Sequence, residues 1–273
     1  MKKILFPFLL LLISLFSSCE EVVDVKLDTA PPRLVVEASI VWIKGSTGNA
    51  QKIKLTTTTG YYDTEIPIVT GANVSITNSD NVIFNFVEIP ETGEYACTDF
   101  EPEIGKNYTL TIIHNGETYT ASETFQSLAP ITRIEQNNEG GFTGKEIEIK
   151  AYFNDPADKD NYYLYKYQYS NETTVSYNVD DDRFFQGNEF FSRSQSDDLK
   201  KGDVIDLTHF GASKQYYNYM NILIGIVGSN SGSPFQTPPA TVRGNIKNST
   251  NPQNYALGYF ALGETDMRRY VVQ

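Results

Sequence analysis

The sequence is poor in the residues that build disulfide frameworks, zinc sites and histidine-dependent active sites. Its 273 residues include only two cysteines and two histidines, His114 and His209. A zinc site or a Ser-His-Asp triad needs several such side chains to converge, and the HExxH, GxSxG and phosphate-loop motifs are absent. Carboxylates are numerous, but their spacing singles out no catalytic pair. The sequence therefore predicts a protein that is not an enzyme, without catalytic residues, metal site or cofactor.

Positive charge is also in short supply. Lysine and arginine together number 22 against 34 aspartate and glutamate residues, which gives a formal net charge of −12. A surface this acidic repels phosphate backbones, so we expect no nucleic acid among the partners. After Phe16 no segment approaches the roughly 18 consecutive apolar residues of a membrane-spanning helix.

The one long apolar run lies at the start of the chain and has the pattern of an export signal. Lys2 and Lys3 precede the hydrophobic stretch 4–16, and two serines lead to Cys19. The stretch is too short to span a bilayer. Small residues directly before a cysteine are what a bacterial lipoprotein signal peptidase requires, because the thiol is acylated and becomes the new N-terminus. We therefore predict a signal peptide over 1–18 and an acylated (palmitate-bearing) Cys19 that anchors the protein. An ordinary signal peptide with an incidental cysteine is the alternative.

Lipidation of Cys19 leaves Cys97 as the only free thiol, so no intramolecular disulfide can form. An unpaired thiol can act as a nucleophile, but a free cysteine is more often a small buried hydrophobe. Residues 19–32 combine charged residues with two prolines and predict a tether between the lipid and the first domain.

Residues 33–130 predict a β-sandwich of immunoglobulin-like type. Apolar side chains alternate along 34–43 with the period of a strand that has one buried face. Two hairpins follow, over 72–86 and 108–121, and an Asn-Gly pair supplies the tight turn of the second. Strands of this length, with turn signals about every ten residues, are typical of a sandwich of roughly one hundred residues.

Residues 131–273 predict a second β-rich domain that contains one helix. Apolar residues recur at helical spacing over 213–227, and Ser213 can cap the N-terminus of that helix. The segment 256–260 predicts the last core strand. The predicted fold class is thus mainly all-β, with two β-sandwich-like domains, the second with one helix.

Four tyrosines on one predicted strand are candidate contacts for a ligand or partner. In an extended segment Tyr163, Tyr165, Tyr167 and Tyr169 share one face. Such a face can stack on sugar rings or grip a protein, and core packing between two sheets, the alternative, uses the same residues. The acidic stretches 155–160 and 180–182 suit either calcium or solvated turns, and neither fits the EF-hand pattern.

Short segments spread along the chain resemble a family of bacterial lipoproteins. They are, with Cys19, RLVVEA (33–38), TGANV (70–74), GEY (93–95), GKNYTL (105–110), DNYY (160–163), PPATVRGNI (238–246) and ALGYF (256–260). As an ordered set they resemble the Bacteroidota lipoproteins catalogued as domain of unknown function 4249. The resemblance implies an outer-membrane lipoprotein, often associated with TonB-dependent receptors or related β-barrels, and it carries over no catalytic residue.

Two further expectations concern the tether. In such bacteria acidic residues directly after the lipidated cysteine act as a surface-export signal, which Glu20 and Glu21 resemble. The triplet Asp28-Thr29-Ala30 resembles the O-glycosylation acceptor pattern of exported proteins in the same group, so Thr29 is a candidate glycan site.

These observations favour a non-enzymatic lipoprotein facing the cell surface, as an accessory or ligand-capturing subunit of an outer-membrane β-barrel complex. The alternative is a glycan- or peptide-binding lipoprotein for nutrient uptake, in which the tyrosine face touches the ligand. A surface glycosidase or esterase ranks third.

Overall fold

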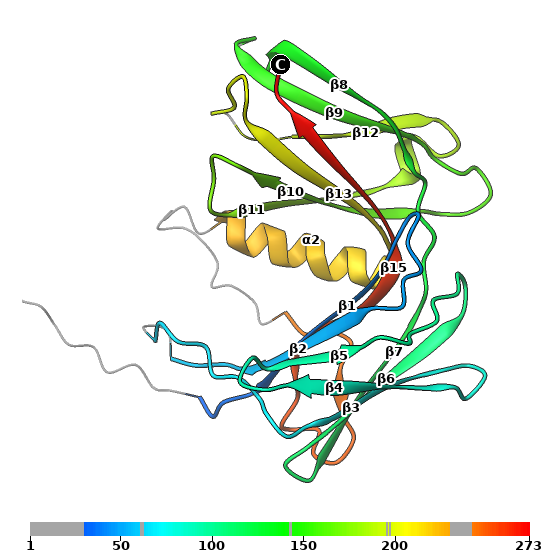
Figure 1. The fold of residues 1–273 in the computed structure, drawn as a ribbon, viewed down its shortest axis with the longest axis vertical. Helices are drawn as coiled ribbons and strands as arrows, with labels where there is room; N and C mark the ends of the chain where they lie inside the picture. The colour runs from blue at the N-terminus through cyan, green and yellow to red at the C-terminus, as the bar shows by residue number, and fades with distance from the viewer. Residues whose placement is uncertain (1–29, 61–62, 142–143, 195, 197, 230–241) are drawn as a thin grey trace, which may run out of the picture. The chain divides into compact units, whose positions relative to one another are not determined.

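Strands make up most of the described chain, and one α-helix accompanies them (Figure 1). The computed structural model describes residues 30–60, 63–141, 144–194, 196, 198–229 and 242–273. The predicted class, mainly β with one helix, is confirmed. The predicted signal peptide, the acylated cysteine, the export signal and the glycan site all fall before residue 30, outside the described residues, and stay predictions. Within the described ranges no helix has the length and apolar character needed to cross a membrane.

The elements have the following bounds: β1 (Leu34–Ile43), β2 (Gln51–Thr57), β3 (Asn73–Asn78), β4 (Ile83–Ile89), β5 (Glu94–Cys97), β6 (Asn107–His114), β7 (Glu117–Thr124), β8 (Ile131–Gly140), β9 (Glu146–Asn154), β10 (Tyr162–Tyr169), β11 (Val175–Asp181), the 3₁₀ turn η1 (Asp182–Phe184), β12 (Glu189–Arg193), β13 (Val204–Ala212), α2 (Lys214–Ser229), β14 (Lys247–Asn248) and β15 (Leu257–Val271). A sheet of twelve strands has the order β11-β10-β13-β15-β1-β2-β5-β4-β3-β6-β7-β14, and a second sheet has the order β12-β9-β8.

The first hydrophobic cluster forms because the large sheet folds over at β4. The first half of β4 pairs with β3, and the segment Val87–Ile89 pairs with β5. Alternate residues of the strands on both sides of this change then face one another, as the alternation along β1 predicts. The cluster contains buried side chains from β1 to β7 and from β15.

Both predicted hairpins are confirmed, since β3 pairs with β4 and β6 pairs with β7 in antiparallel register. The turn of the second hairpin has φ angles of 50° at Asn115 and 76° at Gly116. Positive φ at both central residues matches the twist of the flanking strands, which is why an Asn-Gly pair marks such a turn in the sequence.

A second cluster lies between the three-stranded sheet and one face of β10 and β13. It combines Ile149, Ala151 and Phe153 of β9 with the tyrosines of β10 and with Ile205 and Leu207 of β13. In Figure 1 the strands β8, β9 and β12 lie above β10 and β13. This arrangement buries the side of β10 that the sequence marks with tyrosines.

The opposite face of β10, β13 and β15 is covered by α2, which confirms the predicted helix. The hydroxyl oxygen of Ser213 accepts a hydrogen bond of 3.2 Å from the backbone N–H of Tyr216, as an N-cap residue does. Tyr216 and Met220, one helical turn apart, are buried against Phe210 and Tyr259 in a third cluster.

The strand β15 is longer than predicted and has an unexpected partner. The predicted strand 256–260 is only the start of an element that extends to Val271 and pairs in parallel with β1 and antiparallel with β13. Gly258 lies opposite Val36 with φ of +90°, and a Cβ there would lie 2.0 Å from the Val36 carbonyl oxygen. Glycine is therefore required for this close approach of the two strands.

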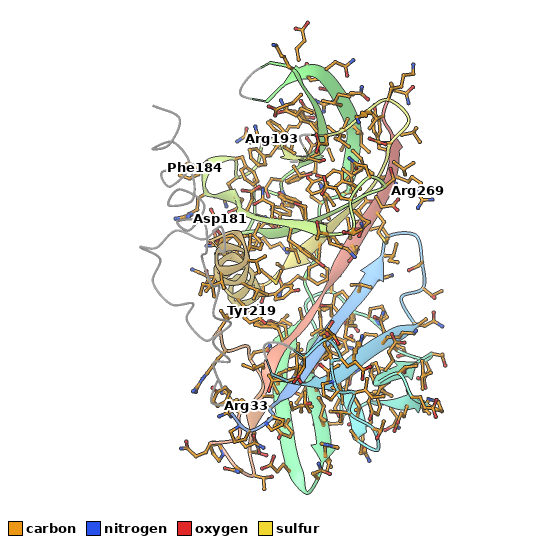
Figure 2. The ribbon with its side chains drawn as sticks, turned by 90° about the vertical axis from the view of Figure 1, so that its left-hand side faces the viewer. Arg33, Asp181, Phe184, Arg193, Tyr219 and Arg269 are labelled. Carbon is orange, nitrogen blue, oxygen red and sulfur yellow. The ribbon has the colours of Figure 1, made fainter. Side chains whose placement is uncertain are left out.

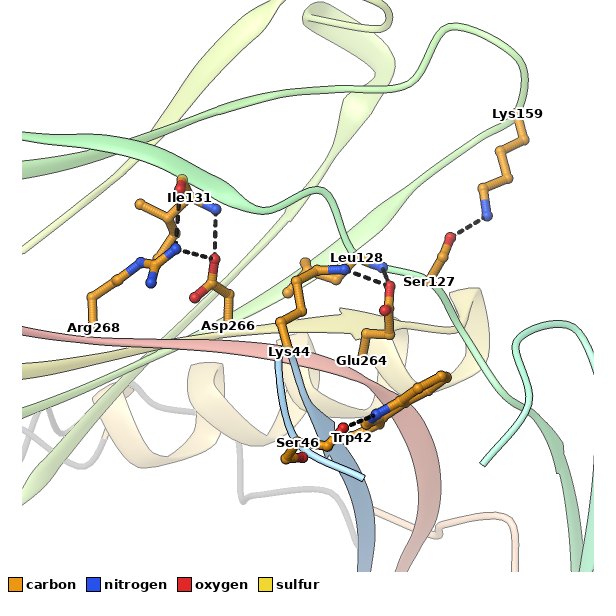
Figure 3. Close-up of polar contacts among 10 residues, drawn as sticks. All are labelled: Trp42, Lys44, Ser46, Ser127, Leu128, Ile131, Lys159, Glu264, Asp266 and Arg268. Carbon is orange, nitrogen blue, oxygen red and sulfur yellow. Dashed lines mark hydrogen bonds and ion pairs between the residues drawn. The ribbon is translucent and has the colours of Figure 1, made fainter. Parts of the chain in front are cut away.

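Two acidic residues of β15 hold the connection between β7 and β8 (Figure 3). Glu264 accepts a hydrogen bond of 2.9 Å from the backbone N–H of Leu128 and forms an ion pair of 2.8 Å with Lys44. Asp266 accepts a hydrogen bond of 2.8 Å from the backbone N–H of Ile131 and another of 3.1 Å from Arg268. Charged acceptors make these contacts stronger than neutral hydrogen bonds, so the connection is a fixed part of the fold.

The cores do not divide the chain at a single point in the sequence. In the N-terminal half, the residues of the first cluster extend to Phe125, and those of the second cluster begin at Leu128, close to the predicted boundary at residue 130. However, Ile246, Ala256, Phe260 and Leu262, assigned to the second domain, belong to the first cluster. The two-domain division stays a prediction.

Candidate functional site

A mainly apolar hollow lies beside α2, and we name it the α2 groove. Its volume is about 560 Å³. Figure 2 labels Tyr219, one of its wall residues, beside the helix. Strands β1, β11 and β15 and the helix supply the residues used below: Glu37, Ser39, Tyr177, Tyr216, Tyr219, Leu223, Val227 and Tyr259.

Tyrosine rings fix the shape of the groove. The rings of Tyr216 and Tyr219 are stacked with centroids 6.4 Å apart, and each lies 4.9 Å from the ring of Tyr259. Tyr177 and Val227 leave 40% and 68% of their surfaces exposed. Because the three packed rings hold one another, the wall is formed before any ligand arrives.

Glu37 is the one charged residue among the described residues that line the groove. It lies on the exposed face of β1 together with Ser39. Burial raises the pKa of Tyr177 and of Tyr219, and the Glu37 carboxylate raises both further. Burial also raises the pKa of Tyr216 to about 12. The tyrosines therefore stay neutral near pH 7, and the groove offers aromatic faces, hydroxyl groups and one carboxylate.

The groove has the chemistry of a binding site. Among the described residues that line it, no histidine, cysteine or lysine lies beside Glu37 as a base or nucleophile. Across the described ranges no three His, Cys, Asp or Glu side chains gather where they could hold a metal ion.

The four candidate tyrosines of β10 lie elsewhere, and the expectation that they contact a ligand or partner is corrected. Tyr163, Tyr165, Tyr167 and Tyr169 are each exposed by no more than 2%. The sheet of β8, β9 and β12 covers them, and Phe153 packs on Tyr163 with ring centroids 4.8 Å apart. The alternative interpretation, core packing between two sheets, is the one that the structure supports.

No sequence pattern marks the groove itself. Helical spacing predicts that Tyr216 and Tyr219 lie on the buried face of the helix. Tyr216 is buried, whereas Tyr219 is only partly buried. The groove exists because β1, β11, α2 and β15 meet, and these elements are far apart in the chain.

Both histidines lie outside any arrangement for catalysis. His209 is buried, its Nε2 lies 2.6 Å from the hydroxyl oxygen of Ser192, and burial lowers its pKa to about 3. Its Nδ1 is buried without a hydrogen-bond partner, so no acid orients the ring as in a triad. His114 lies beside the turn of the second hairpin, next to the amide of Asn115.

The remaining candidate residues, Cys97 and the acidic stretches, make contacts inside the folded protein. Cys97 is buried, and this burial is the main reason why the pKa of its thiol is raised to about 11. The thiol is therefore unreactive near pH 7. In the acidic stretches, Asp155 accepts hydrogen bonds from the hydroxyl of Tyr163 and the backbone of Gly187, and Asp182 accepts one from the backbone of Asn161.

Comparison with protein families decides the classification. A family model described as Domain of unknown function (DUF4249) matches residues 20–269. The chain belongs to this family. The match confirms the resemblance to domain of unknown function 4249, whereas the Bacteroidota origin and the lipoprotein character stay predictions. DUF4249 membership itself specifies no activity. No curated protein matches the chain.

Solved structures similar to this DUF4249 chain are distant. A two-domain fibronectin type III segment of chicken tenascin is 11% identical, with 66% of this chain and 90% of that chain covered and a TM-score of 0.22. The FN1–FN3 domains of chicken CNTN1 are 13% identical, with 68% and 64% covered and a TM-score of 0.25. A DUF4785 family protein from Legionella pneumophila is 7% identical, with 65% and 52% covered and a TM-score of 0.27.

Proposed function

We propose that this protein is a non-enzymatic lipoprotein of the outer-membrane surface that captures a ligand in the α2 groove as an accessory subunit of a TonB-dependent or related β-barrel. The groove carries the proposal, because it is a preformed aromatic hollow whose described lining includes the Glu37 carboxylate. The lipoprotein pattern that ends at Cys19 supports the location.

The anchor is tested by growing cells with a clickable palmitate analogue. The chain has two cysteines, so Cys97→Ser is a matched control for Cys19→Ser. We expect label in the wild type and in Cys97→Ser, and none in Cys19→Ser. An unlabelled, freely diffusing wild-type protein would contradict the anchor.

Surface exposure and partnership need separate measurements. Protease added to intact cells should cleave the wild type and spare a variant with Glu20→Ala and Glu21→Ala. Purification in mild detergent should recover an outer-membrane β-barrel with the protein. A chain that always elutes alone would argue against the accessory role.

The second candidate is a glycan- or peptide-binding protein for nutrient uptake. The packed rings of Tyr219 and Tyr259 favour it, since aromatic faces stack on sugar rings and the Glu37 carboxylate can accept from hydroxyl groups or pair with a basic side chain. Calorimetry against a panel of polysaccharides and basic peptides tests it. Tyr219→Ala should weaken binding about tenfold or more. Tyr217→Ala, on the same helix but outside the groove, should leave it unchanged, and a panel without any saturable ligand would dismiss this candidate.

We also propose that Thr29 carries a glycan, as the Asp28-Thr29-Ala30 triplet suggests. Intact-mass measurement of the wild type and of Thr29→Ala tests this. Equal masses, after allowance for the substitution itself, would end the proposal.

A further inference from the structure

A second hollow, which shares no lining residue with the α2 groove, collects positive charge. It has a volume of about 460 Å³ and lies between β7 and the segment 243–256. We name it the basic pocket, after Arg243 and Lys247, the charged residues that line it. Both side chains are exposed, and Thr120, Asn248, Ser249 and Tyr255 add polar groups.

An aromatic ring fixes the arginine of the pocket. The guanidinium carbon of Arg243 lies 3.8 Å from the centroid of the Tyr255 ring, and that of Arg33 lies at the same distance. Two guanidinium groups cannot occupy one face of a ring, so the two arginines stack on opposite faces. Arg33 also donates a hydrogen bond of 3.0 Å to the carbonyl oxygen of Gln253, which holds the far side of the stack.

The charges of this stack are not neutralised by carboxylates. Within the described ranges Arg33, Arg243 and Lys247 form no ion pair with Asp or Glu, although the chain carries a formal net charge of −12. The stacked Arg133 gives the contrast. It lies 3.7 Å from the ring centroid of Tyr152, and its charge is balanced by ion pairs with Glu135 and Glu189.

Two acids of β7, Glu117 and Glu123, lie near its pairing with β14, and both are already engaged. The Glu123 carboxylate accepts hydrogen bonds of 2.8 Å from the hydroxyl of Ser213 and 3.3 Å from the hydroxyl of Tyr259. The Glu117 carboxylate accepts hydrogen bonds of 2.6 Å from the hydroxyl of Tyr119 and 2.6 Å from the amide of Asn254, and it lines a different hollow. The basic pocket is therefore open to an anion from outside the protein.

The wall of the pocket is preformed. The side chain of Asn248 accepts from the backbone N–H groups of Thr250 at 3.1 Å and Asn251 at 2.9 Å, and it donates to the carbonyl oxygen of Asn254 at 2.8 Å. The backbone N–H of Ser249 bonds the Thr118 carbonyl oxygen at 2.9 Å. A loop held in this way needs little ordering when a ligand binds.

We propose that the basic pocket binds a phosphate group. The planar fork of an arginine suits phosphate oxygens, and a lysine adds a point charge beside it. Two cations match the roughly two negative charges of a phosphate monoester near pH 7. The phosphate belongs either to a soluble phosphorylated compound or to a lipid headgroup. This proposal is independent of the α2 groove and of the lipid anchor.

Calorimetry on the full mature protein in a nonionic detergent at low salt tests the proposal. The probes are inorganic phosphate, glucose 6-phosphate and dihexanoyl phosphatidic acid. We expect saturable binding that weakens as salt is added. Arg243→Gln and Lys247→Gln should each weaken it about tenfold or more, as loss of a charged hydrogen bond does. Lys247→Arg should retain it.

The matched control is Lys201→Gln, which removes the same charge from an exposed position outside the pocket and should leave binding unchanged. Thermal unfolding followed by circular dichroism shows that each variant is folded. Tighter binding of dihexanoyl phosphatidic acid assigns the phosphate to a lipid headgroup, and tighter binding of glucose 6-phosphate assigns it to a soluble compound. Absence of saturable binding of all three probes, or an equal loss in Lys201→Gln, would overturn the proposal.

Discussion

Replacing Asp180 by asparagine should stabilise the protein at neutral pH and leave its stability unchanged in acid. Asp180 lies directly opposite Tyr163 in the pairing of β10 and β11, so its side chain points to the same face, toward the aromatic second cluster. Within the described ranges no hydrogen-bond donor reaches its carboxylate. Burial, and then the charge of Asp181, raises the pKa of Asp180 from 3.8 to about 6.

The sign and size of the effect follow from proton linkage. The folded state binds this proton more tightly than the unfolded state does. The stability that Asp180 contributes is therefore fully present below pH 3.8 and is lost as pH rises through about 6. Two pKa units correspond to about 3 kcal/mol for a fully buried group. Partial exposure of Asp180 to solvent screens this cost, so we expect about 1–2 kcal/mol.

Urea unfolding of the wild type and of Asp180→Asn at about pH 7.5 and about pH 4 measures the difference. The variant should be more stable only at the higher pH. Asp206→Asn is the control of opposite sign, because the ion pair with Arg269 lowers the pKa of Asp206 and its loss should reduce stability at the higher pH. A gain of the same size at both pH values, or a loss at pH 7.5, would refute the assignment of the cost to a desolvated carboxylate.

Four further substitutions test the packing, each by chemical or thermal unfolding. Tyr163→Phe should cost about 1–2 kcal/mol because its hydroxyl donates to Asp155, whereas Tyr165→Phe should be neutral or stabilising because that hydroxyl is buried without a partner; equal effects would contradict this. Asp266→Ala should cost about 2–4 kcal/mol because a buried backbone N–H loses its charged acceptor, and a cost below about 0.5 kcal/mol would show that the contact does not hold the connection between β7 and β8. Gly258→Ala should lower the melting temperature strongly, because its φ is +90° and a β1 carbonyl oxygen would lie 2.0 Å from the new Cβ; a wild-type melting temperature would contradict the close approach.

The elements that the sequence predicted well are those whose signals are local. Alternation along 34–43, the Asn-Gly turn at 115–116 and the cap at Ser213 each depend on a few neighbouring residues, and each corresponds to an element of the structure. Such signals can be recognised from neighbouring residues without knowledge of the tertiary structure.

The tyrosine face of β10 could not be assigned from the sequence, because a row of tyrosines on one face looks the same under a second sheet and at a surface. What decides is the pairing of β8, β9 and β12 into a layer above it. In the described part of the chain no hydrogen-bond partner reaches the buried hydroxyl of Tyr165. Because a tyrosine carries a polar hydroxyl group, its residue type fits a surface position as well as a buried one. Only the tertiary structure shows that these tyrosines belong to the core.

The second half of β15 was not predicted as a strand, for a different reason. Glu264, Asp266, Arg268 and Arg269 interrupt its apolar pattern, and charged residues at such density usually indicate a loop or a solvated edge. Here two of them are acceptors for backbone N–H groups of the connection between β7 and β8, so their burial is compensated. These acidic residues are needed because of backbone N–H groups more than a hundred residues away in the chain. A local sequence pattern cannot indicate such a distant contact.

The parallel pairing of β1 with β15 couples the start of the described chain to its end. Buried Phe260 and Leu262 of β15 fill the first cluster, so the strands of the N-terminal half cannot complete their core until the C-terminal strand is in place. Pairing across so long a sequence separation is slow, and closing the loop costs entropy before the contacts form. Residues of both β1 and β15 line the α2 groove, so the groove exists only when these two strands are paired. A chain shortened before Leu257 should therefore lose the groove together with the first core, which makes ligand binding in the groove a measure of the complete fold.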